Sequence, residues 1–431
     1  MRSLALVFLV TGVFAQELTV EKVFRDTLSN NLELKALELE VKALEREYES
    51  AKGSLFPNLK LEERFVKTDI PAHVLFIKLN QERVTLSSLN DPSPVSGFET
   101  GLRVEVPLWL GGKLRAFRDM ALHRKLAKEK ELSRREEEIL FDAFRSFLKA
   151  SLSRSAIEVA RKNLRDAEEH KRIAEKMYET GTALLSDILR AQVFVSKSRE
   201  SLFQARSDYE LSIKSLSLIS NTDYTGYDVP PLSFCPSLSK GELLEKALRS
   251  REDLRAIEEY LKVLREGYRA QIANNLPQVV AFVSYNLYDR DIPFGSEGKG
   301  YMFGLSVSLS INTGLSSLKK AQSFAQREKA LLKKREFMEK AILFEVEEAH
   351  SRYEVALEKL RSARDRVRQA EETLRIVKVR YSKGLARMVD LLDAQTHLER
   401  ARFDHIKALY ECNLYYGKAL LSAGILREVL R

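Results

Sequence analysis

The sequence predicts a fold that is mainly α with a membrane β-barrel, built from two repeats of helix, strand, strand, helix and helix. Three observations predict it: a motif that occurs twice, two long stretches without proline or internal glycine, and four stretches in which apolar and polar residues alternate. The chain has 431 residues, with 71 Lys plus Arg against 62 Asp plus Glu. Charged residues make up 31% and hydrophobic residues 44%, which excludes global disorder and a collagen-like fibre.

The repeated motif is YETGTALLSDILRAQ at residues 178–192 and YSKGLARMVDLLDAQ at residues 381–395. Seven of the fifteen aligned positions are identical: Tyr178/Tyr381, Gly181/Gly384, Ala183/Ala386, Asp187/Asp390, Leu189/Leu392, Ala191/Ala394 and Gln192/Gln395. A second set also recurs, with Leu34, Ala36 and Pro57 matching Leu254, Ala256 and Pro277. We therefore expect a first repeat over residues 16–220, an inter-repeat linker over 221–239 and a second repeat over 240–431.

The first fifteen residues predict export. Arg2 precedes an apolar stretch at residues 4–10, and the small residues Val13 and Ala15 precede a predicted cleavage before Gln16. The alternative, an N-terminal membrane anchor, would need a longer apolar stretch. An oxidising compartment would let Cys235 and Cys412 pair, and two free thiols are an equal alternative.

Each repeat is expected to begin with a helix of moderate length. Apolar residues at helical spacing cover residues 32–55, and Pro57 ends that helix. In the second repeat, Ser239 and Glu242 have the spacing of a capping box, which predicts a helix from there to about residue 274.

The longest elements are predicted at residues 113–179 and 315–383, which contain no proline and no internal glycine. At 1.5 Å per residue each helix would be about 100 Å long, a length typical of coiled-coil assemblies. Gly181 and Gly384 end these helices, and returning helices are expected to run to about residues 219 and 421.

Two pairs of strands are predicted, at about residues 58–108 and 278–311, because apolar residues alternate there with period two. The runs are about as long as a tilted membrane-spanning strand. An open sheet edge in lipid would leave backbone groups unpaired, and single-chain barrels need at least about eight strands. Three chains sharing one barrel would supply about twelve strands. The alternative is a soluble exported coiled coil carrying two surface hairpins.

Several features together resemble the TolC family of outer-membrane efflux ducts: the element order, the strand entries at Pro57 and Pro277, the strand exit PLWLGG at 107–112 and above all YSKGLARMVDLLDAQ. The resemblance covers essentially the whole chain after the signal peptide. It implies a homotrimer with a barrel in outer-membrane lipid, a coiled-coil helical tunnel in the periplasm and a closing periplasmic tip. It also implies two partners, a periplasmic adaptor protein and an inner-membrane pump of RND or ABC type.

The resemblance also assigns gate residues. Asp390 and Asp393 match the paired tip aspartates that ring the constriction. Asp187 matches the first-repeat aspartate that latches the closed state, and Tyr381 matches the tyrosine that reaches towards it. The family's latch arginine falls at Ala386 here, with Arg387 next to it, so the latch departs from the family pattern.

The tip turns are the second implied site. Gly181 and Thr182 in the first repeat, with Gly384 and Leu385 in the second, match the turns that meet the adaptor's helical hairpin. At the first-repeat position equivalent to Asp393 stands Arg190, so only one repeat supplies the second acidic ring.

No catalytic, cofactor or metal motif is present: the sequence lacks HExxH, a P-loop and GxSxG, so we expect no enzyme and no cofactor. Lys and Arg alternate with Glu along the long helices, which indicates a solvated helix face and not a nucleic-acid surface. The preferred function is a passive exit duct of a tripartite system that exports small molecules, either drugs or metal ions. A duct for type I protein secretion and a coiled-coil surface protein without a pore remain the alternatives.

Overall fold

The computed structural model describes residues 16–85, 93–232, 234–311 and 313–429. The predicted signal peptide lies outside these residues. The chain divides into two compact units. Unit 1 comprises Met1–Leu39, Lys130–Leu254 and Glu336–Arg431, and unit 2 comprises Glu40–Glu129 and Arg255–Arg335.

Ten helices and four strands are formed by the described residues: α1 (Val20–Asn30), α2 (Leu32–Gly53), β1 (Asn58–Thr68), α3 (Pro71–Asn80), β2 (Val95–Trp109), α4 (Lys113–Glu179), α5 (Leu185–Ser220), α6 (Lys240–Ser250), α7 (Glu252–Ala273), β3 (Gln278–Asp289), β4 (Gly298–Ser308), α8 (Ser316–Ser382), α9 (Met388–Ser422) and α10 (Leu426–Val429).

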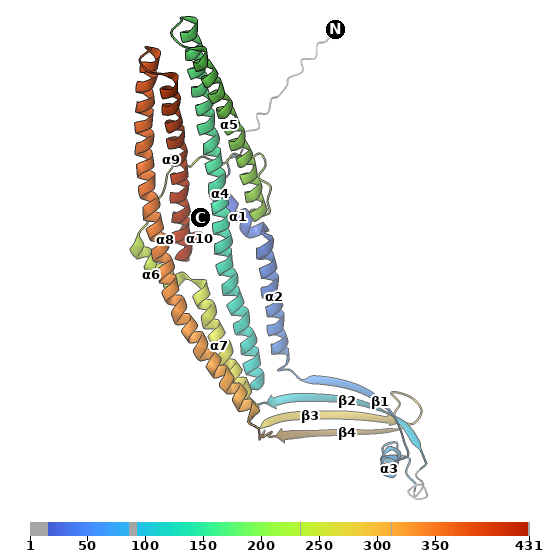
Figure 1. Ribbon diagram of the computed structural model, residues 1–431. Coiled ribbons are helices and arrows are strands. Elements are labelled where there is room, and N and C mark those ends of the chain that lie inside the picture. The colour runs from blue at the N-terminus through green and yellow to red at the C-terminus, as the bar shows by residue number, and fades with distance from the viewer. Residues whose placement is uncertain (1–15, 86–92, 233, 312, 430–431) are drawn as a thin grey trace, which may run out of the picture. The chain divides into compact units, whose positions relative to one another are not determined.

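The two long helices and their returning partners are confirmed. α4 and α8 each run for 67 residues, and α5 and α9 begin after the turns that follow them (Figure 1). The sequence permits this because neither long helix contains proline, which removes a backbone donor, or glycine, which destabilises a helix interior. Within the described residues, no helix is both long and apolar enough to cross a membrane.

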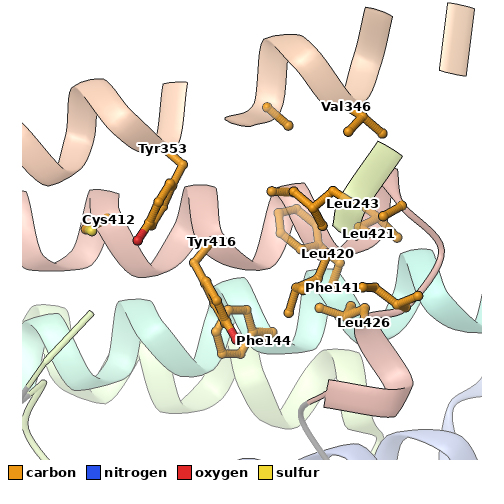
Figure 2. Close-up of a cluster of buried hydrophobic side chains, with 14 of the residues drawn as sticks. Phe141, Phe144, Leu243, Val346, Tyr353, Cys412, Tyr416, Leu420, Leu421 and Leu426 are labelled. Atoms are coloured by element: carbon orange, nitrogen blue, oxygen red, sulfur yellow. The ribbon is translucent and has the colours of Figure 1, made fainter. Parts of the chain in front are cut away.

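The main core of unit 1 gathers aromatic and aliphatic side chains from α4, α6, α8, α9 and α10 (Figure 2). Phe141 and Phe144 from α4 meet Leu420 and Tyr416 from α9 in this cluster. α9 approaches α4 closely at Gly417, where an added Cβ would lie 2.5 Å from the Phe144 ring. A larger residue there would separate the two helices, so glycine sets their spacing.

Each repeat contains a helix interruption that we did not predict. The predicted helix at 240–274 is divided at Arg251 into α6 and α7, and in the first repeat Asn31 separates α2 from an additional helix, α1. The Asn31 side chain donates to the carbonyl oxygen of Ile219 at 2.7 Å, and Arg251 donates to that of Ser422 at 3.0 Å. These are equivalent positions in the two repeats. Each interruption therefore binds the end of the returning helix of its own repeat.

The predicted capping box is wrong. α6 begins at Lys240 as expected, but the Ser239 side chain makes no capping hydrogen bond. The helix end is instead held by its packing, since Leu243 and Ala247 are buried in the main core. Tertiary burial replaces the local cap here.

The linker is fastened to the second repeat. Cys235 and Cys412 form a disulfide, which decides between the two alternatives left open by the sequence. Asn413 donates to the carbonyl oxygen of Phe234 at 2.9 Å, and the Tyr353 hydroxyl donates to that of Pro236 at 2.6 Å. The segment is thereby bound to both α8 and α9.

Unit 2 contains one antiparallel sheet with the strand order β1-β2-β3-β4 (Figure 1). All four strands were predicted, and β4 ends at Ser308, three residues before the end of the predicted range. Val104 pairs with Val283, which pairs in turn with Phe303, so alternate residues of neighbouring strands share a face. α3, which we did not predict, lies by the strand ends, where Gln81 donates to the carbonyl oxygen of Asp289 at 3.3 Å.

One face of this sheet is apolar and exposed. In β4 the side chains of this face are 68–78% exposed, and the same face continues through β3, β2 and β1; its most exposed members are Leu59, Leu61, Phe65, Val283, Tyr301, Phe303, Leu305 and Val307. The opposite face carries Glu62, Arg64, Arg103 and Glu105 in the first two strands. An apolar surface of this extent requires a partner or lipid.

Candidate functional site

The residues that the sequence singles out lie in two turns of unit 1. One turn joins α4 to α5 and the other joins α8 to α9, and both lie at the same end of these helices (Figure 1). The turns have the same construction, because the sequence motif that forms them is repeated.

Each long helix ends in a glycine with left-handed backbone conformation, φ +75° at Gly181 and +72° at Gly384. The Thr182 amide donates to the Met177 carbonyl oxygen at 2.8 Å, and the Leu385 amide donates to the Arg380 carbonyl oxygen at 2.8 Å. Nothing lies within 4 Å of a Cβ added at either glycine, so conformation alone requires the residue.

Each returning helix begins with an aspartate that caps it. The Leu184 amide donates to the Asp187 carboxylate at 3.3 Å, and the Arg387 amide donates to the Asp390 carboxylate at 2.9 Å. These bonds satisfy amides at the helix start, where a carboxylate is also favoured by the helix dipole. The motif aspartates therefore have a structural role in the single chain.

Arg387 and Asp390 also form an ion pair with an N–O distance of 3.1 Å. The Arg387 side chain and its backbone amide lower the pKa of the Asp390 carboxyl. The hydrogen bond and the charge of Asp390, with a smaller contribution from the charge of Asp393, raise the pKa of Arg387. Within the described residues, the side-chain bonds of Arg387 thus lie in its own turn.

Tyr381 is buried among apolar side chains from four helices; the cluster comprises Ala174, Ala191, Tyr381, Met388 and Leu391. Burial, followed by the charge of Asp187, raises the pKa of Tyr381. Its hydroxyl has no hydrogen-bond partner within the described residues. The structure therefore brings Tyr381 and Asp187 into one neighbourhood without a bond between them.

The remaining predicted residues are exposed at the tip. Gly181, Thr182, Gly384 and Leu385 lie on the surface of the two turns, and Asp393 is exposed on α9. The Thr182 hydroxyl donates to the Met177 carbonyl oxygen at 2.9 Å. Arg190 on α5 is also exposed. No group of three or more His, Cys, Asp or Glu in the described part of the chain is arranged to hold a metal ion.

Sequence reasoning missed a buried polar group between α4 and α9. His170 Nε2 lies 3.1 Å from Gln395 Oε1, and both side chains are buried. Glu399 lies one helical turn further along α9, and burial raises the pKa of its carboxyl. Burial lowers the pKa of His170. The identity of Gln192 and Gln395 in the repeated motif was the only signal, and it pointed to no role.

Comparisons with known proteins agree with this architecture. The family model described as "Outer membrane efflux protein" matches residues 23–222 and 243–413. The chain is 21% identical over 400 residues to the probable efflux pump outer membrane protein TtgC and to the antibiotic efflux pump outer membrane protein ArpC, both of Pseudomonas putida. Each alignment covers 90% of this chain and 79% of the relative.

Solved structures share the fold. The outer membrane protein VceC of Vibrio cholerae has a TM-score of 0.77 at 16% identity, covering 94% of this chain and 96% of VceC. The open state of the outer membrane channel MtrE of Neisseria gonorrhoeae has a TM-score of 0.75 at 20% identity, covering 95% of this chain and 90% of MtrE. The family model spans most of the chain in both repeats. The chain therefore belongs to the outer membrane efflux protein family, the TolC-type channels, and is an outer-membrane channel of an efflux pump.

Proposed function

We propose that this chain forms the passive exit duct of a tripartite efflux system. Three copies share one barrel in the outer membrane, and a periplasmic adaptor opens the tip formed by the α4–α5 and α8–α9 turns. An inner-membrane pump, of RND or ABC type, supplies the energy. The exported compounds are small molecules, which the names of the curated relatives, efflux pump proteins for antibiotics or toluene, favour over secreted proteins.

The sheet of unit 2 is the observation that carries this proposal. Its apolar face is exposed, and β1 and β4 have no further strand beside them within the described residues. In lipid, both edges need partners, because an unpaired backbone group there costs several kcal/mol. Pairing β1 of one copy with β4 of the next satisfies both edges and places the apolar face in lipid.

The tip residues supply the proposed gate. Three copies of Asp390 and Asp393 at a narrow mouth focus a negative potential that attracts cations. Asp187 and Tyr381 hold the closed arrangement of the helix ends, Arg387 pairs with Asp390 within its own turn, and the adaptor contacts Gly181, Thr182, Gly384 and Leu385. The adaptor opens the mouth only by binding the open arrangement more tightly than the closed one.

Single-channel conductance of the purified protein in a planar bilayer tests the duct. We expect a small, long-lived, cation-preferring conductance that multivalent cations block from one side. A verified trimer without conductance would indicate a sealed tip that needs its adaptor, and adding that adaptor should open it. If no trimer and no conductance are found, the duct is wrong and the coiled-coil alternative stands.

The gate has a separate test. Asp390→Ala combined with Asp393→Ala should weaken block by multivalent cations added at the periplasmic side. Asp208→Ala combined with Asp404→Ala removes the same charge away from the turns and should leave the block unchanged. Equal block in both double variants would remove the tip aspartates from the mouth.

A further inference from the structure

The second-repeat tip carries a strong excess of positive charge. Residues 361–383, at the end of α8 and the start of its turn, are named here the basic segment and contain eight Lys or Arg and three Asp or Glu. The equivalent residues of the first repeat, 158–180 at the end of α4, contain six of each. The two repeats thus have the same turn but different charge. The eight cations are Arg361, Arg364, Arg366, Arg368, Arg375, Lys378, Arg380 and Lys383.

Five of these cations have no ion pair in the described part of the chain: Arg364, Arg366, Lys378, Arg380 and Lys383. Three others pair with acids on their own helix, namely Arg361 with Glu358, Arg368 with Asp365 and Arg375 with Glu372. Those pairs are exposed and contribute little to stability. The unpaired cations are therefore available to an external group.

Apolar side chains lie among the cations at the tip. Ile376, Val379 and Leu385 are 46%, 45% and 66% exposed. Ile376, Val379 and Lys383 follow at intervals of three and four residues, so they lie along one strip of the helix surface. An apolar centre with a charged rim is the arrangement of a protein interface, and the helical spacing fits another helix. A free polyanion without apolar groups would leave the apolar centre exposed to water.

A second copy of this chain would not neutralise the excess. The two tip segments, residues 158–208 and 361–411, together contain 22 Lys or Arg against 17 Asp or Glu. Every copy in a homo-oligomer brings the same surplus, so its neutralisation requires a molecule of different composition. The partner must carry the negative charge.

We infer that the basic segment is a docking surface for the acidic face of a helical hairpin, and that it binds this hairpin more tightly than the first-repeat tip does. The assignment of this hairpin to a periplasmic adaptor rests on the proposed function; its acidic chemistry rests on the charges of α8. The two tips of one chain then bind the hairpin unequally. Long-range attraction increases the association rate, and the apolar centre is buried on docking.

Two synthetic helical-hairpin peptides with the same apolar seam serve as probes, one with Glu and the other with Lys at the solvent-facing positions. Binding to the full-length channel is measured at low and high salt. We expect the Glu hairpin to bind, more weakly as salt rises, and the Lys hairpin not to bind. An unstructured peptide of equal negative charge distinguishes docking from general attraction of polyanions.

Charge reversal locates the surface. Lys378→Glu with Lys383→Glu should weaken binding of the Glu hairpin about tenfold and favour the Lys hairpin. Lys176→Glu with Lys197→Glu makes the same charge change on exposed positions of the first repeat and should alter the affinity much less.

Four results would overturn the inference: no binding of either hairpin, equal affinity for both, equal loss in the first-repeat variant, or equal binding of the unstructured peptide. Conductance recorded on the same preparations separates this question from the duct itself. A channel that conducts normally but does not discriminate between the hairpins refutes only the acidic partner. Absence of both trimer and conductance in the unmodified protein refutes the proposed function.

Discussion

Gly384 shows how a single residue sets the tip. Its φ of +72° is unfavourable for any residue with a Cβ, and no neighbouring atom would obstruct that Cβ. Gly384→Ala should therefore destabilise the turn by about 1–2 kcal/mol through backbone conformation alone. We expect faster hydrogen exchange of the Leu385 amide, which bonds across the turn.

Gly53 provides the matched control for this substitution. It lies in α2 with ordinary helical backbone, and an added Cβ would again meet nothing within 4 Å. Gly53→Ala should be neutral or slightly stabilising, because alanine is the better helix former. Similar exchange at the Leu385 amide in wild type and Gly384→Ala would show that the turn does not depend on the left-handed residue.

Glu137 gives unit 1 a pH dependence. Burial raises the pKa of its carboxyl to about 7, against the opposing effect of Arg134 and Arg251. Between the unfolded pKa of about 4.3 and pH 7 the folded state holds more protons than the unfolded state, so stability falls as pH rises through this range. Glu137→Gln should raise the unfolding temperature at pH 8 and leave it unchanged at pH 4.

The same measurement on Glu158→Gln controls for loss of a charge, since Glu158 is exposed on the same helix. When the pKa shift is converted to free energy, the expected increase in the free energy of unfolding for Glu137→Gln at pH 8 is at most of the order of 3 kcal/mol. A gain of equal size at pH 4 would show that neutralising the carboxyl is not its cause.

At the scale of elements, the helices and strands were predictable where local pattern decided them. The stretches around α4 and α8 contain no breaker, and the alternation in β2 and β4 leaves one face apolar. The interruptions at Asn31 and Arg251 were not predictable, because they depend on carbonyl groups of Ile219 and Ser422 that are distant in sequence.

The candidate site was likewise predictable from the sequence only where a local pattern decides the structure. The repeated motif located both tip turns and the aspartates Asp187 and Asp390, because these residues serve the turn itself. The ion pair of Arg387 was not predicted, since no local pattern distinguishes a latch from a pair within one turn. The buried contact of His170 with Gln395 joins α4 to α9, so it appears only when the helices pack.

The disulfide should hold the linker to α9. Cys235 and Cys412 are separated by 177 residues, and closing so long a loop restricts the unfolded chain by up to about 5 kcal/mol in the entropic model. Cys235→Ser with Cys412→Ser should lower the unfolding temperature and loosen residues 234–236, measured by hydrogen exchange. Reducing agent should reproduce this in wild type and have no effect on the double variant. An unchanged unfolding temperature would show that the hydrogen bonds of Asn413 and Tyr353 hold the linker alone.

At the scale of the whole molecule, three features have no partner among the residues that the structure describes: the sheet edges, the apolar sheet face and the positive charge of the basic segment. Different molecules satisfy them. In the proposed duct, another copy pairs with the edges, lipid covers the apolar face and an acidic partner neutralises the charge. The proposed assembly thus uses chemistry that is already present in the monomer.

The sheet face offers the sharpest test of this assembly. Leu305 belongs to the apolar face of β4, and the adjacent Ser306 belongs to the opposite face. Arginine at position 305 would therefore point towards lipid, whereas arginine at position 306 would point towards the barrel interior from nearly the same place in the strand. Leu305→Arg should abolish or reduce the outer-membrane trimer, because a charge at the bilayer midplane costs roughly 2–4 kcal/mol per chain. Ser306→Arg should assemble normally and change ion selectivity instead. Trimer yield from outer-membrane fractions measures the first effect and single-channel recording the second. Normal assembly of both variants would mean that this face does not meet lipid, whereas failure of both would mean that arginine disrupts the strand and not the membrane contact.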